Sequence, residues 1–173
     1  RRIDDLGRIV IPKEIRRTLH IRESDPLEIF TDREGQVILK KYSPIGEMTT
    51  FAKQYAESLA QVSGHATLIA DRDQFIAVSG GCKQLLNKSV SRQLEEKVNR
   101  ETVIAAKGDR NYVNIAEDIA VDYAWQLITP IICEGDIIGS VILLENDGKS
   151  KMGEVEQKLA LSAAGFLGRQ MEQ

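Results

Sequence analysis

The first segment of the chain, residues 1–42, has more apolar side chains than a module of its size can bury alone. A module of about forty residues without a disulfide or a metal rarely folds by itself, because it removes too small a fraction of its surface from water. The segment contains no cysteine, and its apolar residues include Ile3, Leu6, Ile9, Ile11, Ile15, Leu19, Leu27, Ile29, Val37 and Leu39. We therefore expect it to share a core with another copy of the chain, as an obligate dimer.

Local patterns in this segment predict a strand, a helix and a hairpin. Three β-branched residues in a row are typical of a strand, and the Pro12 that follows them fits the first turn of a helix, where its missing N–H is not needed. Gly35 ends a polar turn and is free to take a positive φ. The predicted elements are a strand at 9–11, a helix at 12–20 and strands at 27–30 and 36–40.

The remainder of the chain is long enough to bury a core of its own. Residues 43–46 are Ser-Pro-Ile-Gly, a composition typical of a loop. We place a linker at 44–50, between a first domain at 1–43 and a second at 51–173. The second part is predicted to hold helices at 48–62 and 153–171, a mixed helical region at 83–100, and strands at 66–70, 75–78, 103–106, 125–133 and 137–144. This order predicts an α+β fold, an antiparallel sheet with flanking helices.

Charge is distributed unevenly along the chain. The net charge is −3, yet residues 1–41 hold ten basic and eight acidic residues, and residues 1–22 alone hold seven basic and three acidic ones. Such asymmetry indicates an anionic partner for the basic part. Arginine is suited to nucleic acid, because its guanidinium donates paired hydrogen bonds to phosphate and to the edge of guanine. The alternative is a solvated charged surface, and the arginines concerned are Arg1, Arg2, Arg8, Arg16 and Arg17.

Three features bear on the compartment. The chain has no run of 18 or more apolar residues and no visible secretory signal, so we expect no membrane partner. Its two cysteines, Cys82 and Cys133, are too few for a disulfide framework, which indicates the reducing cytoplasm. The chain begins at Arg1 and not at Met, so we expect part of the native N-terminus to be missing.

The first segment resembles a known DNA-binding domain. The stretch RRIDDLGRIVIPKEIRRTLHIRESDPLEIF, continuing to GQVILKKY, is similar to the swapped-hairpin domain of AbrB-type transition-state regulators. The resemblance implies a domain-swapped β-barrel built by two chains, whose first strand is truncated here. It also implies that double-stranded DNA is bound without a strict consensus, with phosphate contacts and DNA shape supplying the preference. The residues that match the DNA-contacting motifs are Arg1, Arg8, Arg16 and Arg17, with Lys13 nearby and Arg2 a weaker match.

The rest of the chain resembles the sporulation regulators of this family, which carry a GAF-like domain. The resemblance is carried by YSPIGEM, by the closing MGEVEQKLALSAAGFLGRQMEQ and by the GAF-like middle. It implies an activator and repressor of sporulation genes, associated with the nucleoid of the forespore. It also implies a homotetramer of two DNA-binding dimers, joined through the helices at 47–62 and 153–171. For either helix, packing on its own sheet is an equal alternative.

GAF domains bind small molecules in a pocket between sheet and helices, so this chain has candidate pocket residues. Ser79 and Cys82 flank a glycine pair that suits such a loop, and Tyr112 and Trp125, with Tyr123, would supply aromatic walls. Ordinary turn and core packing is the alternative for each of them. The pattern of cyclic-nucleotide-binding GAF domains is absent, so the effector stays unidentified.

Two other functions are alternatives to the regulator. A GAF-like class of sulfoxide reductases uses cysteines, but nothing in the sequence around Cys82 or Cys133 establishes an activated thiol. Antitoxins share the N-terminal fold, although their toxin-binding tails are usually short. His20 and His65 stand apart from any cluster with metal-ligand spacing. We therefore expect no enzyme activity, no catalytic residue, no cofactor and no metal.

Overall fold

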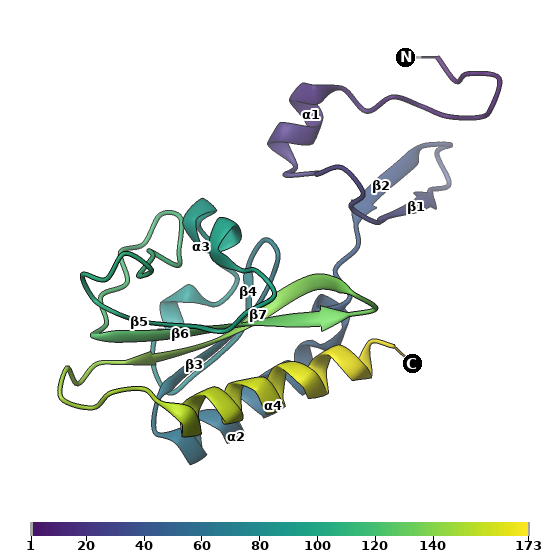
Figure 1. The fold of residues 1–173 in the computed structure, drawn as a ribbon. Coiled ribbons are helices and arrows are strands. Elements are labelled where there is room, and N and C mark those ends of the chain that lie inside the picture. Colours follow the sequence, from purple (N-terminus) through teal and green to yellow (C-terminus); the bar gives the residue numbers. More distant parts are fainter. Residues whose placement is uncertain (1, 173) are drawn as a thin grey trace. The chain divides into compact units, whose positions relative to one another are not determined.

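The computed structural model describes residues 2–172 and divides the chain into two compact units (Figure 1). The first unit is Arg1–Tyr42 and the second is Ser43–Gln173. Both combine helices with antiparallel strands, so the expected α+β class is confirmed.

The first unit contains one short helix and one hairpin. Its elements are α1 (Lys13–Thr18), β1 (Leu27–Thr31) and β2 (Val37–Lys41), with β1 and β2 antiparallel. Asp32 shapes the connecting turn, because its Oδ1 accepts hydrogen bonds from the N–H groups of Glu34 (2.9 Å) and Gln36 (2.8 Å). Gly35 has a φ of +81°, as predicted from the turn composition.

The strand predicted at 9–11 does not form within a single chain. These residues have no regular secondary structure, and Ile9 and Val10 are 54% and 74% exposed. A strand needs a neighbouring strand to pair its N–H and C=O groups, and the described part of this unit offers none to this segment. None of residues 2–42 is buried. The apolar side chains of the first unit are therefore left without a core.

The second unit is built on a five-stranded antiparallel sheet with strand order β4-β3-β7-β6-β5. Between β6 and β7, Glu134 and Gly135 both have positive φ (+49° and +87°), which is the backbone of a tight two-residue hairpin turn. The predicted helical region at 83–100 forms two short helices, η2 and α3. The elements are η1 (Ile45–Met48), α2 (Thr49–Ser63), β3 (Ala66–Asp71), β4 (Phe75–Ser79), η2 (Lys83–Leu85), α3 (Arg92–Lys97), β5 (Val103–Ala106), β6 (Trp125–Cys133), β7 (Asp136–Glu145) and α4 (Glu154–Gln170).

Each face of this sheet has its own apolar core. Figure 1 shows α2 and α4 together on one face, with α3 and the irregular segments on the other. The α2–α4 face buries side chains such as Ile69, Leu127 and Leu143, and the opposite face buries Leu68 and Phe75. Successive residues of a strand point to opposite faces, so fully buried strands such as β3 serve both cores.

The segment expected to be a linker is folded into the second unit. Residues 44–50 hold η1 and the start of α2, and Ile45 is 1% exposed. A Cβ added to Gly139 of β7 would lie 2.8 Å from Cδ1 of Ile45, so the missing side chain makes room for it. Ser43 donates a hydrogen bond from Oγ to Oδ2 of Asp71 (2.8 Å). The Pro and Gly that suggested a linker instead shape a tight turn into α2.

Candidate nucleic-acid interface

A tight loop at residues 4–8 presents Arg8. The N–H of Gly7 donates to the carbonyl oxygen of Asp4 (3.1 Å), and the N–H of Asp4 donates to the carbonyl oxygen of Arg8 (3.1 Å). The Oδ1 atom of Asp4 accepts hydrogen bonds from the N–H groups of Leu6 (3.0 Å) and Arg8 (2.8 Å). Gly7 has a φ of +76°, a conformation that glycine adopts without steric conflict. The loop is therefore closed around one carboxylate.

The same carboxylate holds the guanidinium of Arg8. Its Nε lies 2.8 Å from Oδ2 of Asp4, and the Arg8 side chain is 70% exposed. The backbone N–H of Arg8 is the main cause that lowers the pKa of Asp4, and the Arg8 side chain and the N–H of Leu6 act in the same direction. Asp4 is therefore ionised at neutral pH. The remaining guanidinium N–H groups of Arg8 form no hydrogen bond with residues 2–172.

Helix α1 carries the other described basic residues of the predicted interface. Pro12 precedes its first residue, Lys13, and accepts a backbone hydrogen bond from Arg16 (3.0 Å). Arg16 and Arg17 lie in the last turn, where the negative end of the helix dipole favours cations. Both are exposed, and neither forms an ion pair with any residue that the structure describes.

The predicted DNA-contacting residues thus share one unit and a short stretch of chain. Arg8, Lys13, Arg16 and Arg17 are all exposed, and Arg1 lies outside the described residues. Arg16 and Arg17 are not paired with any of residues 2–172 and are free to neutralise a phosphate, whereas Arg8 is paired with Asp4 through Nε and keeps its terminal nitrogens for such a contact. Sequence reasoning proposed these arginines as DNA contacts, which stays a prediction, and did not single out Asp4, although an Asp followed three residues later by Gly is a recognisable turn signal.

In the second unit, two of the four predicted pocket residues meet at Tyr123. Its hydroxyl oxygen lies 2.8 Å from Sγ of Cys82, and its carbonyl oxygen accepts a hydrogen bond from the hydroxyl of Tyr112 (2.9 Å). A Cβ added to Gly81 would lie 3.3 Å from the Tyr123 hydroxyl. Burial, and to a lesser extent Cys82, raises the pKa of Tyr123 to about 12. The phenol is therefore neutral at physiological pH.

The structure separates the other two predicted pocket residues from this group. Trp125 packs against the core on the α2–α4 face, whereas Cys82 belongs to the core on the opposite face. Ser79 ends β4, opposite Thr67 of β3. The expectation of a shared pocket wall therefore needs correction, because β6 begins at Trp125 and its pleat turns this side chain toward the helices.

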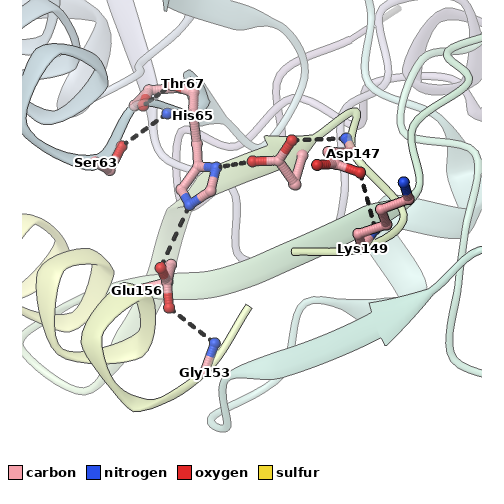
Figure 2. Close-up of polar contacts among 8 residues, drawn as sticks. Ser63, His65, Thr67, Asp147, Lys149, Gly153 and Glu156 are labelled. Atoms are coloured by element: carbon pink, nitrogen blue, oxygen red, sulfur yellow. Dashed lines mark hydrogen bonds and ion pairs between the residues drawn. The ribbon is translucent and has the colours of Figure 1, made fainter. Parts of the chain in front are cut away.

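A second polar cluster, which sequence reasoning missed, joins the α2–β3 connection to β7 and α4 (Figure 2). The Nδ1 atom of His65 lies 2.5 Å from Oε2 of Glu145, and its Nε2 lies 3.4 Å from Oε1 of Glu156. The N–H of Gly153 donates to Oε2 of Glu156 (2.8 Å) and is the main cause that lowers the pKa of this carboxyl; His65 adds to it. No local sequence pattern predicts this cluster, because its members are up to 91 residues apart.

Neither cysteine has the surroundings of a nucleophile. Burial raises the pKa of the Cys82 thiol, against a smaller opposing effect of the Tyr123 hydrogen bond. Burial and nearby carboxylates, led by Glu134, raise the pKa of Cys133. A reactive thiol needs the opposite shift. Over residues 2–172, no three His, Cys, Asp or Glu side chains are grouped to hold a metal ion, and no helix is long and apolar enough to cross a membrane.

Comparison with known families assigns both units. Residues 47–172 match the family model described as stage V sporulation protein T C-terminal, transcription factor. Residues 1–47 match the model described as antidote-toxin recognition MazE, bacterial antitoxin. The antitoxin match is thus confined to the N-terminal part, whereas the sporulation match covers the rest of the chain.

Two curated relatives from Bacillus subtilis extend this assignment. Stage V sporulation protein T is 54% identical over 174 aligned positions, which cover 100% of this chain and 96% of that protein. Transition state regulatory protein AbrB is 39% identical over 101 positions, which cover 58% of this chain and 85% of that protein. The first match runs through both units and favours a regulator over an antitoxin.

Solved structures show the fold of the second unit. The GAF domain of an Acinetobacter phosphoenolpyruvate-protein phosphotransferase has a TM-score of 0.58 at 14% identity and covers 72% of this chain and 81% of its own. A type II free methionine-R-sulfoxide reductase from Thermoplasma acidophilum has a TM-score of 0.53 at 12% identity and covers 72% of this chain and 94% of its own. These similarities establish a GAF-like fold for the second unit, and they say nothing about its activity. The matches of both units show that the chain belongs to the stage V sporulation protein T family, whose members are sporulation transcription regulators with an AbrB-like N-terminal domain.

Proposed function

We propose that the chain regulates sporulation genes by binding double-stranded DNA through Arg8, Arg16 and Arg17, with Lys13 assisting. The observation that carries this assignment is that both arginines of α1 are exposed and free of ion pairs with residues 2–172. Free guanidinium groups bind phosphate and guanine edges through paired donors. Arg1 joins the set through the family resemblance alone.

The DNA-binding form is a dimer of interleaved N-terminal units. The support is the exposure of the apolar residues of the first unit, including 69% for Ile29 and 64% for Val37. A second copy that covers these side chains removes them from water and gives the segment at 9–11 a strand to pair with. A two-fold dimer also presents the arginine set twice, to two half-sites.

The interface is tested by fluorescence anisotropy of an A·T-rich duplex against salt concentration. We expect Arg16→Ala/Arg17→Ala to lower the affinity by tenfold or more and to reduce the slope of log affinity against log salt by about 0.9 for each phosphate that the variant no longer neutralises. The matched control is Arg110→Ala/Lys149→Ala, which removes two exposed positive charges from the second unit. Equal effects of the two double variants would show that net charge, and not this interface, governs binding.

The second element of the proposal is a tetramer, in which two dimers associate through α2 and α4. The support is the exposed apolar residues on these helices: Phe51 (52%) and Val62 (73%) on α2, and Val155 (67%) and Leu161 (48%) on α4. Sedimentation velocity tests it, since Val155→Glu/Leu161→Glu should convert tetramers into dimers. Sedimentation of the wild-type chain as a dimer would remove this element from the proposal.

Small-molecule sensing by the GAF-like domain is the third element. Its support is the fold, together with the Cys82–Tyr123 pair on the sheet face opposite α2 and α4. Coupling requires a ligand whose affinity differs between DNA-bound and free protein. Adding nucleotides, amino acids and sugar phosphates one class at a time to the DNA titration should identify a class that shifts the affinity, and Tyr123→Phe should weaken that shift.

The site of action follows from the partner. We propose that the chain works in the cytoplasm at the nucleoid, because its proposed partner is chromosomal DNA, and in the forespore, because its relatives are sporulation regulators. Fluorescence microscopy of a tagged chain in sporulating cells tests this placement, since signal is expected over the forespore DNA. A diffuse signal in both compartments would contradict it.

A further inference from the structure

The carboxylate of Asp4 lies beside Arg8 of the proposed DNA interface, where a negative charge opposes binding. It lies in the same tight loop as Arg8, within residues 4–8. A like charge near phosphate lowers the attraction between protein and DNA. A carboxylate at this position therefore needs a compensating role.

That role is visible in how the two oxygens of Asp4 are used. Oδ1 accepts the N–H groups of Leu6 (3.0 Å) and Arg8 (2.8 Å), which fixes the backbone of the loop. Oδ2 lies 2.8 Å from Nε of Arg8, which fixes the side chain of the same residue. One carboxylate thus sets both the path of the chain at Arg8 and the direction of its guanidinium.

The remaining donors of Arg8 are suited to DNA. A guanidinium has five N–H groups, and an acceptor at Nε leaves the four on the terminal nitrogens available for a bidentate contact. These groups form no hydrogen bond with residues 2–172, and the side chain is 70% exposed. An exposed arginine that is already restrained loses less side-chain entropy when it binds.

We propose that Asp4 is a positioning residue for DNA recognition, which holds the Arg8 guanidinium so that its terminal nitrogens face paired acceptors on the DNA. The inference rests on the proposed function of Arg8. The lowered pKa of Asp4 keeps the carboxylate charged throughout the pH range of DNA binding. Because the pair is exposed, its effect lies in orientation, and its contribution to folding stability is small.

The substitution that isolates this role is Asp4→Asn in the full chain. Asn keeps an Oδ1 acceptor for the two backbone N–H groups, so the loop can persist, while its NH2 group replaces Oδ2 and faces the Nε donor of Arg8. The matched control is Asp5→Asn, which removes the same charge from the neighbouring exposed residue. Circular dichroism and thermal melting verify that both variants fold like the wild-type chain.

The expected result separates orientation from charge. Both substitutions make the protein more positive, so simple electrostatics raises the DNA affinity in each case. We expect Asp5→Asn to bind at least as tightly as the wild type, and Asp4→Asn to bind about threefold to tenfold more weakly. In an Arg8→Ala background, Asp4→Asn should no longer lower the affinity.

The sequence of the duplex identifies the acceptor. A weaker affinity of Asp4→Asn on an A·T-only duplex and on a G·C-containing duplex alike assigns the contact to phosphate. A weaker affinity confined to the G·C-containing duplex assigns it to a guanine edge. Either pattern supports the positioning role.

Three results would overturn the inference or its basis. If Arg8→Ala binds like the wild type, Arg8 has no place in the proposed interface. If Arg8→Ala binds weakly but Asp4→Asn behaves like Asp5→Asn, the interface stands and the positioning role fails. If Asp4→Asn lowers the affinity equally in the Arg8→Ala background, Asp4 acts through another group and the positioning role also fails.

Discussion

The two units differ in what they do with apolar side chains. In the first unit, Ile29 and Leu39 face each other across the β1–β2 hairpin and are 69% and 41% exposed. In the second, Leu68 and Ile142 face each other across β3 and β7 and are fully buried. Both pairs are built from the same residue types on antiparallel strands. Apolar content therefore shows that a strand needs a partner, and the length of chain around it decides whether that partner comes from the same copy.

Separating the two units tests this comparison most severely. We expect residues 43–173 to fold alone with a cooperative thermal transition, because both cores lie inside them. Residues 1–42 should be unfolded when dilute and gain structure with concentration, because their core comes from a second copy. Circular dichroism over a range of concentrations measures both. A fragment 1–42 that is folded at every dilution would refute the shared core.

A leucine in each unit gives the next largest difference. Leu68→Ala should reduce the free energy of unfolding of the second unit by about 2–5 kcal/mol, because it leaves a cavity in a buried strand. Leu39→Ala should leave that transition unchanged and instead weaken dimerisation of the N-terminal units. Denaturant unfolding and sedimentation separate the two effects, and a loss of second-unit stability in Leu39→Ala would contradict the division.

Two glycines of α4 sharpen the picture of packing inside the second unit. A Cβ on Gly168 would overlap the carbonyl oxygen of Ile132, a backbone atom, whereas a Cβ on Gly165 would meet nothing closer than the Arg169 side chain at 3.7 Å. We expect Gly168→Ala to destabilise by about 1–3 kcal/mol. Gly165→Ala should stabilise by about 0.5–1 kcal/mol through helix propensity. Denaturant unfolding of both variants checks the opposite signs.

The smallest expected effect is dependent on pH. The pKa of Glu156 is lowered in the folded state, mainly by the N–H of Gly153, so this carboxylate stabilises the fold at pH above its ordinary value of 4.5. That stability is lost as the pH falls through the folded pKa. Glu156→Gln should therefore cost about 1 kcal/mol or less at pH 7 and nothing in acid. Denaturant unfolding at a series of pH values measures this cost, and a cost that stays constant with pH would contradict an electrostatic origin.

Elements set by neighbouring residues could be predicted from the sequence. The turns at Gly35 and Gly135 and the closing helix α4 follow from local composition and spacing, and the structure confirms them. The prediction of a strand at 9–11 was wrong for the single chain, because a strand depends on a neighbour that local composition cannot supply. The segment at 44–50 is folded and not a linker, because Ile45 is buried next to Gly139, a contact with a residue that is distant in sequence.

In the candidate sites, too, the sequence predicts what depends on neighbouring residues and not the contacts that depend on the tertiary fold. The arginines could be proposed from the sequence because their chemistry is local; α1 places Arg16 and Arg17 in its last turn, and their contact with DNA stays a prediction. Tyr123 and Trp125 share parity in sequence, which suggests a common face, but β6 begins at Trp125 and the alternation does not extend back to Tyr123. The contacts of His65 with Glu145 and Glu156 depend on the tertiary fold alone.

The burial of Ile45 in the second unit limits where the domains of such regulators can be exchanged. Along the chain the first unit ends at residue 42, and the residues from 43 onward belong to the GAF-like unit. If residues 1–50 were replaced by those of another regulator, Ile45 would be lost from the core of the second unit, and its place beside Gly139 would have to be filled by a foreign side chain. A splice after residue 42 keeps both halves whole, so one bond defines where these modules can be exchanged.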